Sequence, residues 1–186
     1  QSEKVEPLLA EIGKRIENSP YTYRNALDFV IVGKYYLEQG EDAKLVLDRV
    51  FKEIQKSQPR LAEGFVAAGE LALQKQDFGL AAVNFEKAVK LEPNNPAIHY
   101  ALARCYASSD AEKSDAALEK ALELNPHHVP SLLIQVDDHI DAERYEAAAK
   151  VLTDVEKIHP KHPEALAYRA VLAHLDHRLD DEKTAR

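Results

Sequence analysis

The residues that could carry chemistry in this chain are its histidines, its only cysteine and a group of aspartates. The chain has eight histidines. Neighbouring positions hold His127 and His128, His159 and His162, and His174 and His177. Imidazole pairs that converge in space are typical of zinc sites, because neutral imidazole is the commonest metal-binding side chain. No carboxylate or thiolate stands at a fixed spacing from these pairs, so we predict no metal and no cofactor.

The aspartates Asp137, Asp138 and Asp141 form the densest acidic group. Asp137 and Asp141 are four residues apart, which on a helix places both on one face, where like charges repel mildly. We interpret the group as a solvated or partner-facing acidic patch. Cys105, as the single cysteine, excludes an internal disulfide and a thiolate metal site. Its surroundings predict a buried, inert thiol.

Catalytic motifs are absent from the sequence. It contains no G-x-x-x-x-G-K-[ST], no G-x-G-x-x-G, no G-x-S-x-G and no H-E-x-x-H. With only six glycines in 186 residues, no segment could form a phosphate-cradling loop. We therefore predict no catalytic residue and no enzymatic activity.

The composition restricts the partners. The formal net charge is −8, and the 24 basic residues are interleaved with 32 acidic ones. No stretch forms the one-sided basic field that phosphate backbones require, so nucleic acid is excluded as a partner. Uncharged apolar runs such as residues 29–33 are far shorter than the roughly 20 residues that cross a bilayer, so no membrane insertion is expected. One thiol does not indicate a redox compartment.

The elements that must position any binding residues recur along the chain. Pro59, Pro93, Pro126 and Pro160 each follow a helix-like run. Their separations are 34, 33 and 34 residues (93 − 59, 126 − 93, 160 − 126). Alanine, leucine, glutamate and lysine dominate the composition, which favours helices. A 34-residue period is typical of a helix-turn-helix unit, whereas the 33-residue ankyrin signature T-P-L-H-x-A is absent.

Residues 62–95 carry this pattern most completely. They read Phe65-x2-Ala68-Gly69-x2-Ala72, then Ala81-x3-Phe85-x2-Ala88, then Pro93. This arrangement resembles the tetratricopeptide repeat family, whose unit has the pattern W-x2-L-G-x2-Y, A-x3-F and P. Phe65 occupies the large slot of the first helix, and Gly69 occupies its small slot.

The resemblance extends over the whole chain and implies an all-α fold, a right-handed α-solenoid of stacked antiparallel helix pairs. The predicted units are a half repeat at 1–20, repeats at 22–59, 62–95, 96–128 and 129–162, and a truncated repeat at 163–186 that holds a first helix only. The half repeat consists of one helix over Glu3–Asn18. Because the array opens and closes on half a unit, we interpret the chain as an excised segment of a larger protein.

The small slots hold Gly33, Gly69 and Ala103, which lets the second helix cross the first closely. The second helix of repeat 22–59 is about two residues longer than usual. In repeat 129–162, Gln135, Val136 and His139 stand where the family has leucine, glycine and tyrosine. We interpret all these residues as core residues or as residues that end a helix.

First helices line the concave face in this family, so the resemblance implies that a partner contacts first-helix residues outside the packing slots. The residue after each large slot is apolar, and the residue after each small slot is mostly charged. The predicted partner-binding residues are Val30, Lys34, Val66, Glu70, Tyr100, Arg104, Leu133, Asp137, Ala167 and Val171. Tyr100 is the expected anchor.

The predicted function is that of a protein-protein interaction scaffold that binds a peptide or a helix of a partner in the concave groove. Some relatives clamp the terminal carboxylate of chaperone tails. The corresponding positions here hold Val30, Lys34, Ala67 and Ala101, which cannot form that clamp. The alternatives are a non-catalytic repeat segment of a larger, exported peptidase-like bacterial protein, suggested by residues 162–170, and a structural spacer or self-association module that acts through the terminal half repeats.

Overall fold

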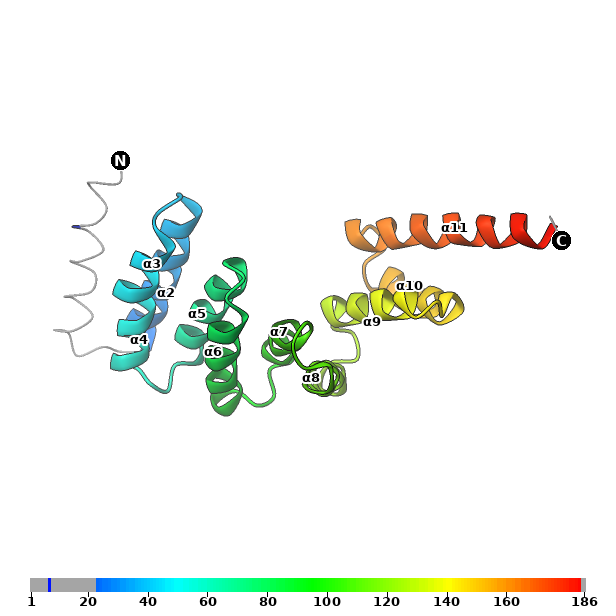
Figure 1. Ribbon diagram of the computed structural model, residues 1–186. Helices are drawn as coiled ribbons and strands as arrows, with labels where there is room; N and C mark the ends of the chain where they lie inside the picture. The colour runs from blue at the N-terminus through cyan, green and yellow to red at the C-terminus, as the bar shows by residue number, and fades with distance from the viewer. Residues whose placement is uncertain (1–6, 8–22, 185–186) are drawn as a thin grey trace. The chain divides into compact units, whose positions relative to one another are not determined.

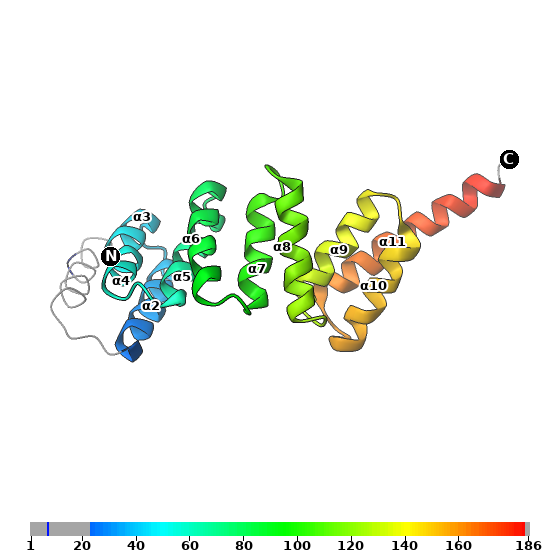
Figure 2. The ribbon, with the colours of Figure 1, turned by 90° about the horizontal axis from the view of Figure 1, so that it is seen from below.

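The computed structural model describes the backbone of Pro7 and of residues 23–184, and within the latter the side chains of residues 26–175. The predicted helix over Glu3–Asn18 lies outside the described residues. All regular secondary structure in the described part is helical, as Figures 1 and 2 show, so the predicted all-α class of stacked helix pairs is confirmed. The chain divides into two compact units, residues 1–118 and 119–186.

Unit 1 consists of successive helix pairs. The helix α2 (Tyr23–Glu38) packs against α3 (Ala43–Val46), the π-helical turn η1 (Leu47–Phe51) and α4 (Lys52–Ser57), which follow one another as a single second helix. The next pair is α5 (Ala62–Gln74) and α6 (Phe78–Leu91). Then come α7 (Pro96–Tyr106) and α8 (Ala111–Leu124), and the boundary between the two units falls inside α8.

Short polar side chains start several of these helices. Asp42 Oδ1 accepts hydrogen bonds from the backbone N–H groups of Lys44 and Leu45, at 2.8 and 3.0 Å. Asp77 Oδ1 accepts from Leu80 N at 3.0 Å, and Asn95 Oδ1 accepts from Ala97 N at 3.1 Å. Each of these bonds satisfies a donor that the first turn of a helix leaves unpaired.

The small slot of α5 brings its partner helix close. A Cβ atom added at Gly69 would lie 2.8 Å from Cζ of Phe85, whose side chain is 1 % exposed. Gly33 of α2 makes the same approach, since an added Cβ would lie 2.6 Å from Cε1 of Phe51. Phe51 and Phe85 therefore occupy equivalent places, each filling the space that a glycine leaves open.

Two additional residues separate Gly33 from Phe51, compared with Gly69 and Phe85 (51 − 33 = 18; 85 − 69 = 16). One lies between the helices, because Ala43 starts ten residues after Gly33 and Phe78 nine after Gly69. The other lies in η1, between Ala43 and Phe51 (51 − 43 = 8; 85 − 78 = 7). A π-turn absorbs one inserted residue and returns the following side chain to its α-helical direction.

A buried polar link joins two successive second helices. Nε2 of Gln55, in α4, donates to Oδ1 of Asn84 at 2.9 Å and to the carbonyl of Gly64 at 3.1 Å. Nδ2 of Asn84, in α6, donates to the carbonyl of Leu80 at 2.8 Å. Asn84 is only 5 % exposed, so these partners satisfy an amide that would otherwise be buried at a cost.

Three residues between paired helices have left-handed backbone. Gly40 has φ of 85°, Gln76 has φ of 59° and Glu143 has φ of 57°. At Gln76 the chain leaves α5 with hydrogen bonds from Gln76 N to the carbonyl of Leu73 and from Asp77 N to that of Ala72. This is the usual way for a helix to end, but glycine adopts it at lower cost than glutamine.

Unit 2 contains α9 (Val129–Asp141), α10 (Tyr145–Ile158) and α11 (Pro163–Thr184). Its core is formed by Leu132, Leu133, Val136, Ala148, Leu152, Val155, Ala165 and Leu172. Val136, the valine in the small slot, is completely buried. The helix α11 packs against α10 and α9, and it contributes Ala165 and Leu172 to this core.

Candidate protein-binding face

The first helices α2, α5 and α7 of unit 1 bring predicted partner-binding residues to the surface. Lys34, Glu70 and Arg104, one from each helix, are exposed. Val66 and Tyr100 are partly buried beside them. We call these five residues the first-helix face of unit 1. They occupy equivalent positions in successive repeats.

Lys34 and Glu70 interact directly across α2 and α5. Nζ of Lys34 lies 2.7 Å from Oε2 of Glu70, and their side chains are 46 % and 47 % exposed. An ion pair with this exposure contributes about 0 to 1 kcal/mol to stability, because water and salt screen it. The pair therefore orders the surface more than it holds the helices together.

Tyr100 and Arg104 form the aromatic part of the face. They lie four residues apart on α7, and the guanidinium carbon of Arg104 lies 5.7 Å from the centroid of the Tyr100 ring. A cation above an aromatic ring at this distance is attracted by the ring quadrupole. The contact holds the arginine side chain beside the ring, where both can meet a ligand.

Two residues of the predicted apolar row are buried. Val30 is 5 % exposed in the core of α2, η1 and α4, and Leu133 is 4 % exposed in the core of unit 2. Repeat spacing places both at the edge of a helix face, but neighbouring helices cover them. Their accessibility was wrongly assumed from the sequence, and they act as core residues.

In unit 2 the predicted residues Asp137, Ala167 and Val171 are exposed, with Val171 at 44 %. The hydroxyl of Tyr168, on α11, donates to Oδ1 of Asp137, on α9, at 2.9 Å. Burial, this hydrogen bond and the nearby carboxylates of Glu164 and Asp141 raise the pKa of the Tyr168 hydroxyl. Tyr168 thus donates a hydrogen bond to one carboxylate of the acidic patch.

The cysteine is buried, and His128, His159 and His162 have side-chain contacts. Cys105 is 2 % exposed on α7, and burial raises the pKa of its thiol to about 11, so the thiolate is disfavoured at neutral pH. Nδ1 of His128 lies 2.8 Å from Oγ of Ser131, and the rings of His159 and His162 meet edge to face at 5.4 Å. Within the described residues, no three His, Cys, Asp or Glu side chains form a metal-binding group.

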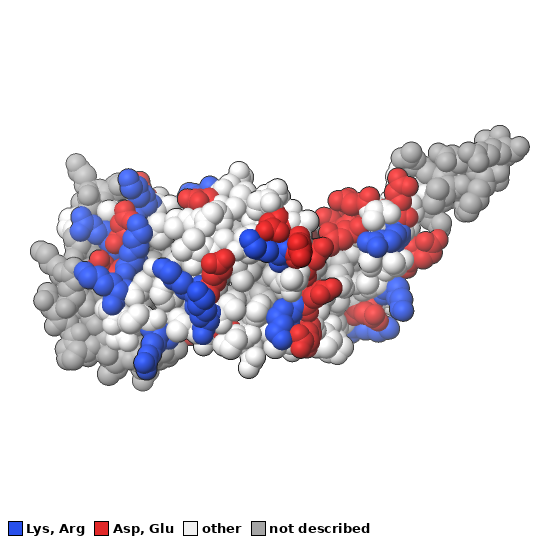
Figure 3. Space-filling view, turned by 60° about the horizontal axis from the view of Figure 1, so that its bottom comes forward, with Lys and Arg blue, Asp and Glu red and all other residues white. Residues whose placement is uncertain are grey.

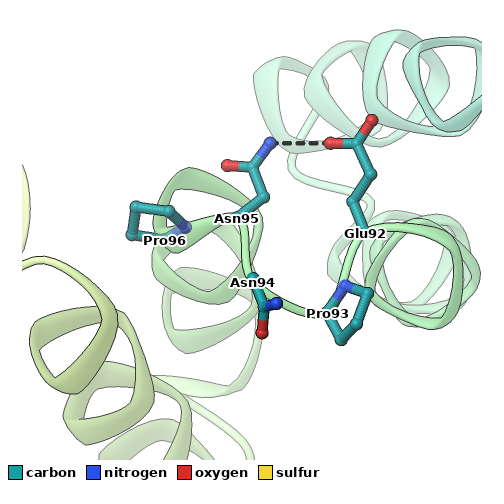
Figure 4. A pocket seen from close by; sticks show the side chains of 5 residues that line it. All are labelled: Glu92, Pro93, Asn94, Asn95 and Pro96. Carbon is teal, nitrogen blue, oxygen red and sulfur yellow. Dashed lines mark hydrogen bonds between the residues drawn. The ribbon is translucent and has the colours of Figure 1, made fainter.

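A surface pocket of about 420 Å³ lies in the turn between α6 and α7 (Figure 4). It is lined by Glu92, Pro93, Asn94, Asn95 and Pro96, none of which was predicted from the sequence as a binding residue. Nδ2 of Asn95 donates to Oε2 of Glu92 at 2.8 Å, and its Oδ1 caps α7. Both the nitrogen and the oxygen of the Asn95 side chain are hydrogen-bonded within the turn. We therefore interpret this pocket as a hollow formed by the shape of the turn and not as a ligand site.

Charges of both signs are interleaved on the molecular surface. Figure 3 shows Lys and Arg side chains next to Asp and Glu on the face that it draws. Paired examples within the described residues include Lys52 with Asp48 and Lys113 with Asp110. No helix in the described part of the chain has the length and apolar content needed to cross a membrane.

Some contacts of the predicted partner-binding residues could not be foreseen from repeat spacing alone. The i, i+4 spacing of Tyr100 and Arg104 is a readable signal, since such residues are neighbours on a helix. The partnership of Tyr168 with Asp137 joins residues 31 positions apart. It depends on how α9 and α11 pack, which the sequence pattern does not specify.

Comparison with known proteins gives the family. Two family models, both described as tetratricopeptide repeat, match residues 72–114 and 135–182. The mitochondrial import receptor subunit TOM70 of Mus musculus is 32% identical over 77 residues, and the human protein is 30% identical. The match covers 40% of this chain and only 13% of either receptor subunit.

Solved structures show the same fold. MamA (residues 41 to the end) from Desulfovibrio magneticus RS-1 has a TM-score of 0.65 at 20% identity, covering 87% of this chain and 88% of that one. YrrB, described as a TPR protein with an unusual peptide-binding site, has a TM-score of 0.62 at 18% identity, covering 88% and 82%. The two matching family models show that the chain contains tetratricopeptide repeats.

Proposed function

We propose that the first-helix face of unit 1 binds a peptide or a helix of a partner protein. Tetratricopeptide repeats generally mediate protein-protein interactions. The observation that carries the proposal is the set of accessible side chains that successive first helices place in equivalent positions: Lys34 in contact with Glu70, and Tyr100 in contact with Arg104. Such a row offers a segment of polypeptide repeated contacts along its length.

The size of this face favours a transient interaction. A helix of about 13 residues is about 20 Å long, and three neighbouring helices at about 9 Å spacing are about 27 Å across. The product, roughly 500 Å² per partner, is below the roughly 800 Å² per partner of a standard interface. Affinity must then come from a few anchors, and aromatic and arginine side chains dominate such anchors.

The chemistry of the face also describes the bound segment. Val66 and the ring of Tyr100 offer apolar contact, whereas the Arg104 guanidinium above that ring favours a neighbouring carboxylate or carbonyl. A segment with an apolar residue next to an acidic or polar one meets both demands. Two similar proteins have names that fit such a role: TOM70 is an import receptor subunit, and YrrB has a peptide-binding site.

A random peptide library displayed on phage and panned against the immobilised chain tests the proposal. The selected peptides are expected to lose about tenfold or more in affinity for Tyr100→Glu and Arg104→Glu, because these changes reverse the charge and remove the aromatic contact. Lys90→Glu is the matched control, an exposed reversal on the second helix α6. Leu133 is unsuitable as a test residue because it is buried.

The opposite result would contradict the proposal. If peptides bind Arg104→Glu and Lys90→Glu as tightly as the unchanged chain, the bound surface lies elsewhere. Circular dichroism is measured for each variant. An unchanged helical signal shows that the variant is folded, so a loss of binding is then due to the changed surface residue.

A further inference from the structure

The second helix of repeat 22–59, formed by α3, η1 and α4, exposes only basic residues over the stretch 43–56. These exposed residues are Lys44, Arg49, Lys52 and Lys56, and we call them the basic stripe. The other residues of the stretch are buried or half-buried. By contrast, the second helices α6 and α10 each expose apolar, acidic and basic residues together. The stripe is therefore a local exception on a chain whose net charge is −8.

The π-turn η1 brings the stripe to one side of the helix. Lys44 and Arg49 are five residues apart, a separation that directs side chains to different sides of a regular α-helix. The residue inserted in η1 brings them back into line. Counted from the helix starts and from Phe51 and Phe85, the stripe corresponds to residues 79, 83, 86 and 90 of α6, which follow a spacing of i, i+4, i+7 and i+11.

The carboxylates of the same helix balance only part of this charge. Oδ1 of Asp48 lies 2.6 Å from Nζ of Lys52, and Oε2 of Glu53 lies 3.6 Å from Nζ of Lys56. The two lysine side chains are 54 % and 73 % exposed, whereas those of Asp48 and Glu53 are 40 % and 24 % exposed. The ammonium groups therefore face solvent more than the carboxylates do.

Lys44 and Arg49 carry charge that is not held in an ion pair. Among the residues that the structure describes, no carboxylate forms an ion pair with either of them. A hydrogen bond from Lys52, together with the positive charges of Lys52, Lys44 and Arg49, lowers the pKa of Asp48. This shift shows that the cations act on one place. A carboxylate brought there by a partner would be attracted in the same way.

We propose that the basic stripe binds an acidic segment of a partner polypeptide. The stripe covers 12 helical residues (56 − 44 = 12), about 18 Å, so its four cations are about 6 Å apart on average. In an extended segment, alternate side chains point the same way and are about 6.6 Å apart. Four carboxylates at alternate positions of about seven residues therefore match the four cations.

The charge of the whole chain favours a short acidic segment over a larger polyanion. Nucleic acid and anionic membranes extend beyond a stripe of about 18 Å and would approach a molecule whose net charge is −8. The proposal does not depend on the first-helix face, because the stripe lies on a second helix and the two surfaces share no residue.

An NMR titration of the isotope-labelled full chain with the peptide ESESESE tests the proposal at low ionic strength. We expect amide shifts on residues 43–57, and we expect the affinity to fall with added salt because the contact is ionic. Arg49→Glu is expected to weaken binding about fivefold or more, since it reverses one cation of the stripe. Lys150→Glu, at an exposed residue of α10, changes the net charge equally and is the matched control. It is expected to bind like the unchanged chain.

Three results would overturn the proposal: no shifts at peptide concentrations up to about 5 mM, shifts on other helices, or equal weakening by Lys150→Glu. Arg104→Glu separates the two surfaces and is expected to leave peptide binding unchanged. Weakening there, with none in Arg49→Glu, would place the peptide on the first-helix face. Duplex DNA of about 12 base pairs and vesicles containing phosphatidylserine are titrated in parallel. If either shifts the same amides at lower concentration than the peptide, the stripe is a general polyanion site and the proposal is wrong.

Discussion

Gln76 and Glu143 adopt a backbone conformation that costs an ordinary residue about 1 kcal/mol more than glycine. We predict that Gln76→Gly raises the free energy of unfolding by about 0.5 to 1 kcal/mol, because the relief of strain exceeds the entropy that glycine gains in the unfolded chain. Urea unfolding followed by circular dichroism measures the change. Lys75→Gly is the control: its φ of −91° suits any residue, so the same substitution there lowers the midpoint. A higher midpoint in both variants would contradict the explanation.

At the scale of single residues, the sequence predicts packing better than exposure. Gly69 and Phe85 were identifiable because repeat slots fix which residue types meet. Val30 and Leu133 occupy slots that are open on an ideal repeat, and their burial depends on the side chains around them. The sequence named Lys34 and Glu70 as charged residues of one row, and their direct contact at 2.7 Å comes only from the structure.

The π-turn η1 delivers Phe51 to Gly33, and this contact can be tested. An added Cβ at Gly33 would lie 2.6 Å from Cε1 of Phe51 and 3.1 Å from Cγ1 of Val50. We predict that Gly33→Ala lowers the free energy of unfolding by about 1 to 3 kcal/mol through overpacking. Phe51→Leu in the same chain restores part of the loss, as urea unfolding of the single and double variants will show.

Gly79→Ala supplies the comparison for this experiment. Gly79 lies in α6, where the nearest atom to an added Cβ is 3.9 Å away, so alanine there raises stability by its better helix propensity, about 1 kcal/mol. If both glycine variants become more stable, Phe51 does not fill the space at Gly33. At this scale, the long second helix of repeat 22–59 was predicted from the distance between the first-helix slots and Pro59 (59 − 33 = 26, against 93 − 69 = 24). Its division between a longer connection and a π-turn was not, because a hydrophobic pattern does not say where a helix absorbs an insertion.

The division into two compact units leads to a prediction for the whole molecule. Repeat arrays derive stability from contacts between neighbours, so damage in one unit spreads weakly. We predict that Leu152→Ala, which empties a completely buried site in unit 2, increases amide hydrogen exchange in α9 and α10 by tenfold or more. Amides of α5 and α6 keep their protection.

Phe85→Ala is the reciprocal variant, and it exposes the amides of α5 and α6 while those of α9 and α10 stay protected. Equal acceleration in both units, for either variant, would mean that the chain unfolds as one cooperative body.

At this scale, the sequence predicted the family and the helix pairs, because a period of 34 residues determines both. It did not predict the division near Leu118, since the repeat spacing runs through that point without interruption.

The hydrogen bonds of Gln55 with Asn84 also make the repeats individual. The repeats of an array can be exchanged for one another when all interfaces between neighbouring repeats are alike. Here one junction carries a matched amide pair. If another repeat replaced the one that supplies Gln55, Oδ1 of the buried Asn84 would lose its donor, at a cost of about 1 to 3 kcal/mol. The order of these two modules is thus encoded in their shared boundary.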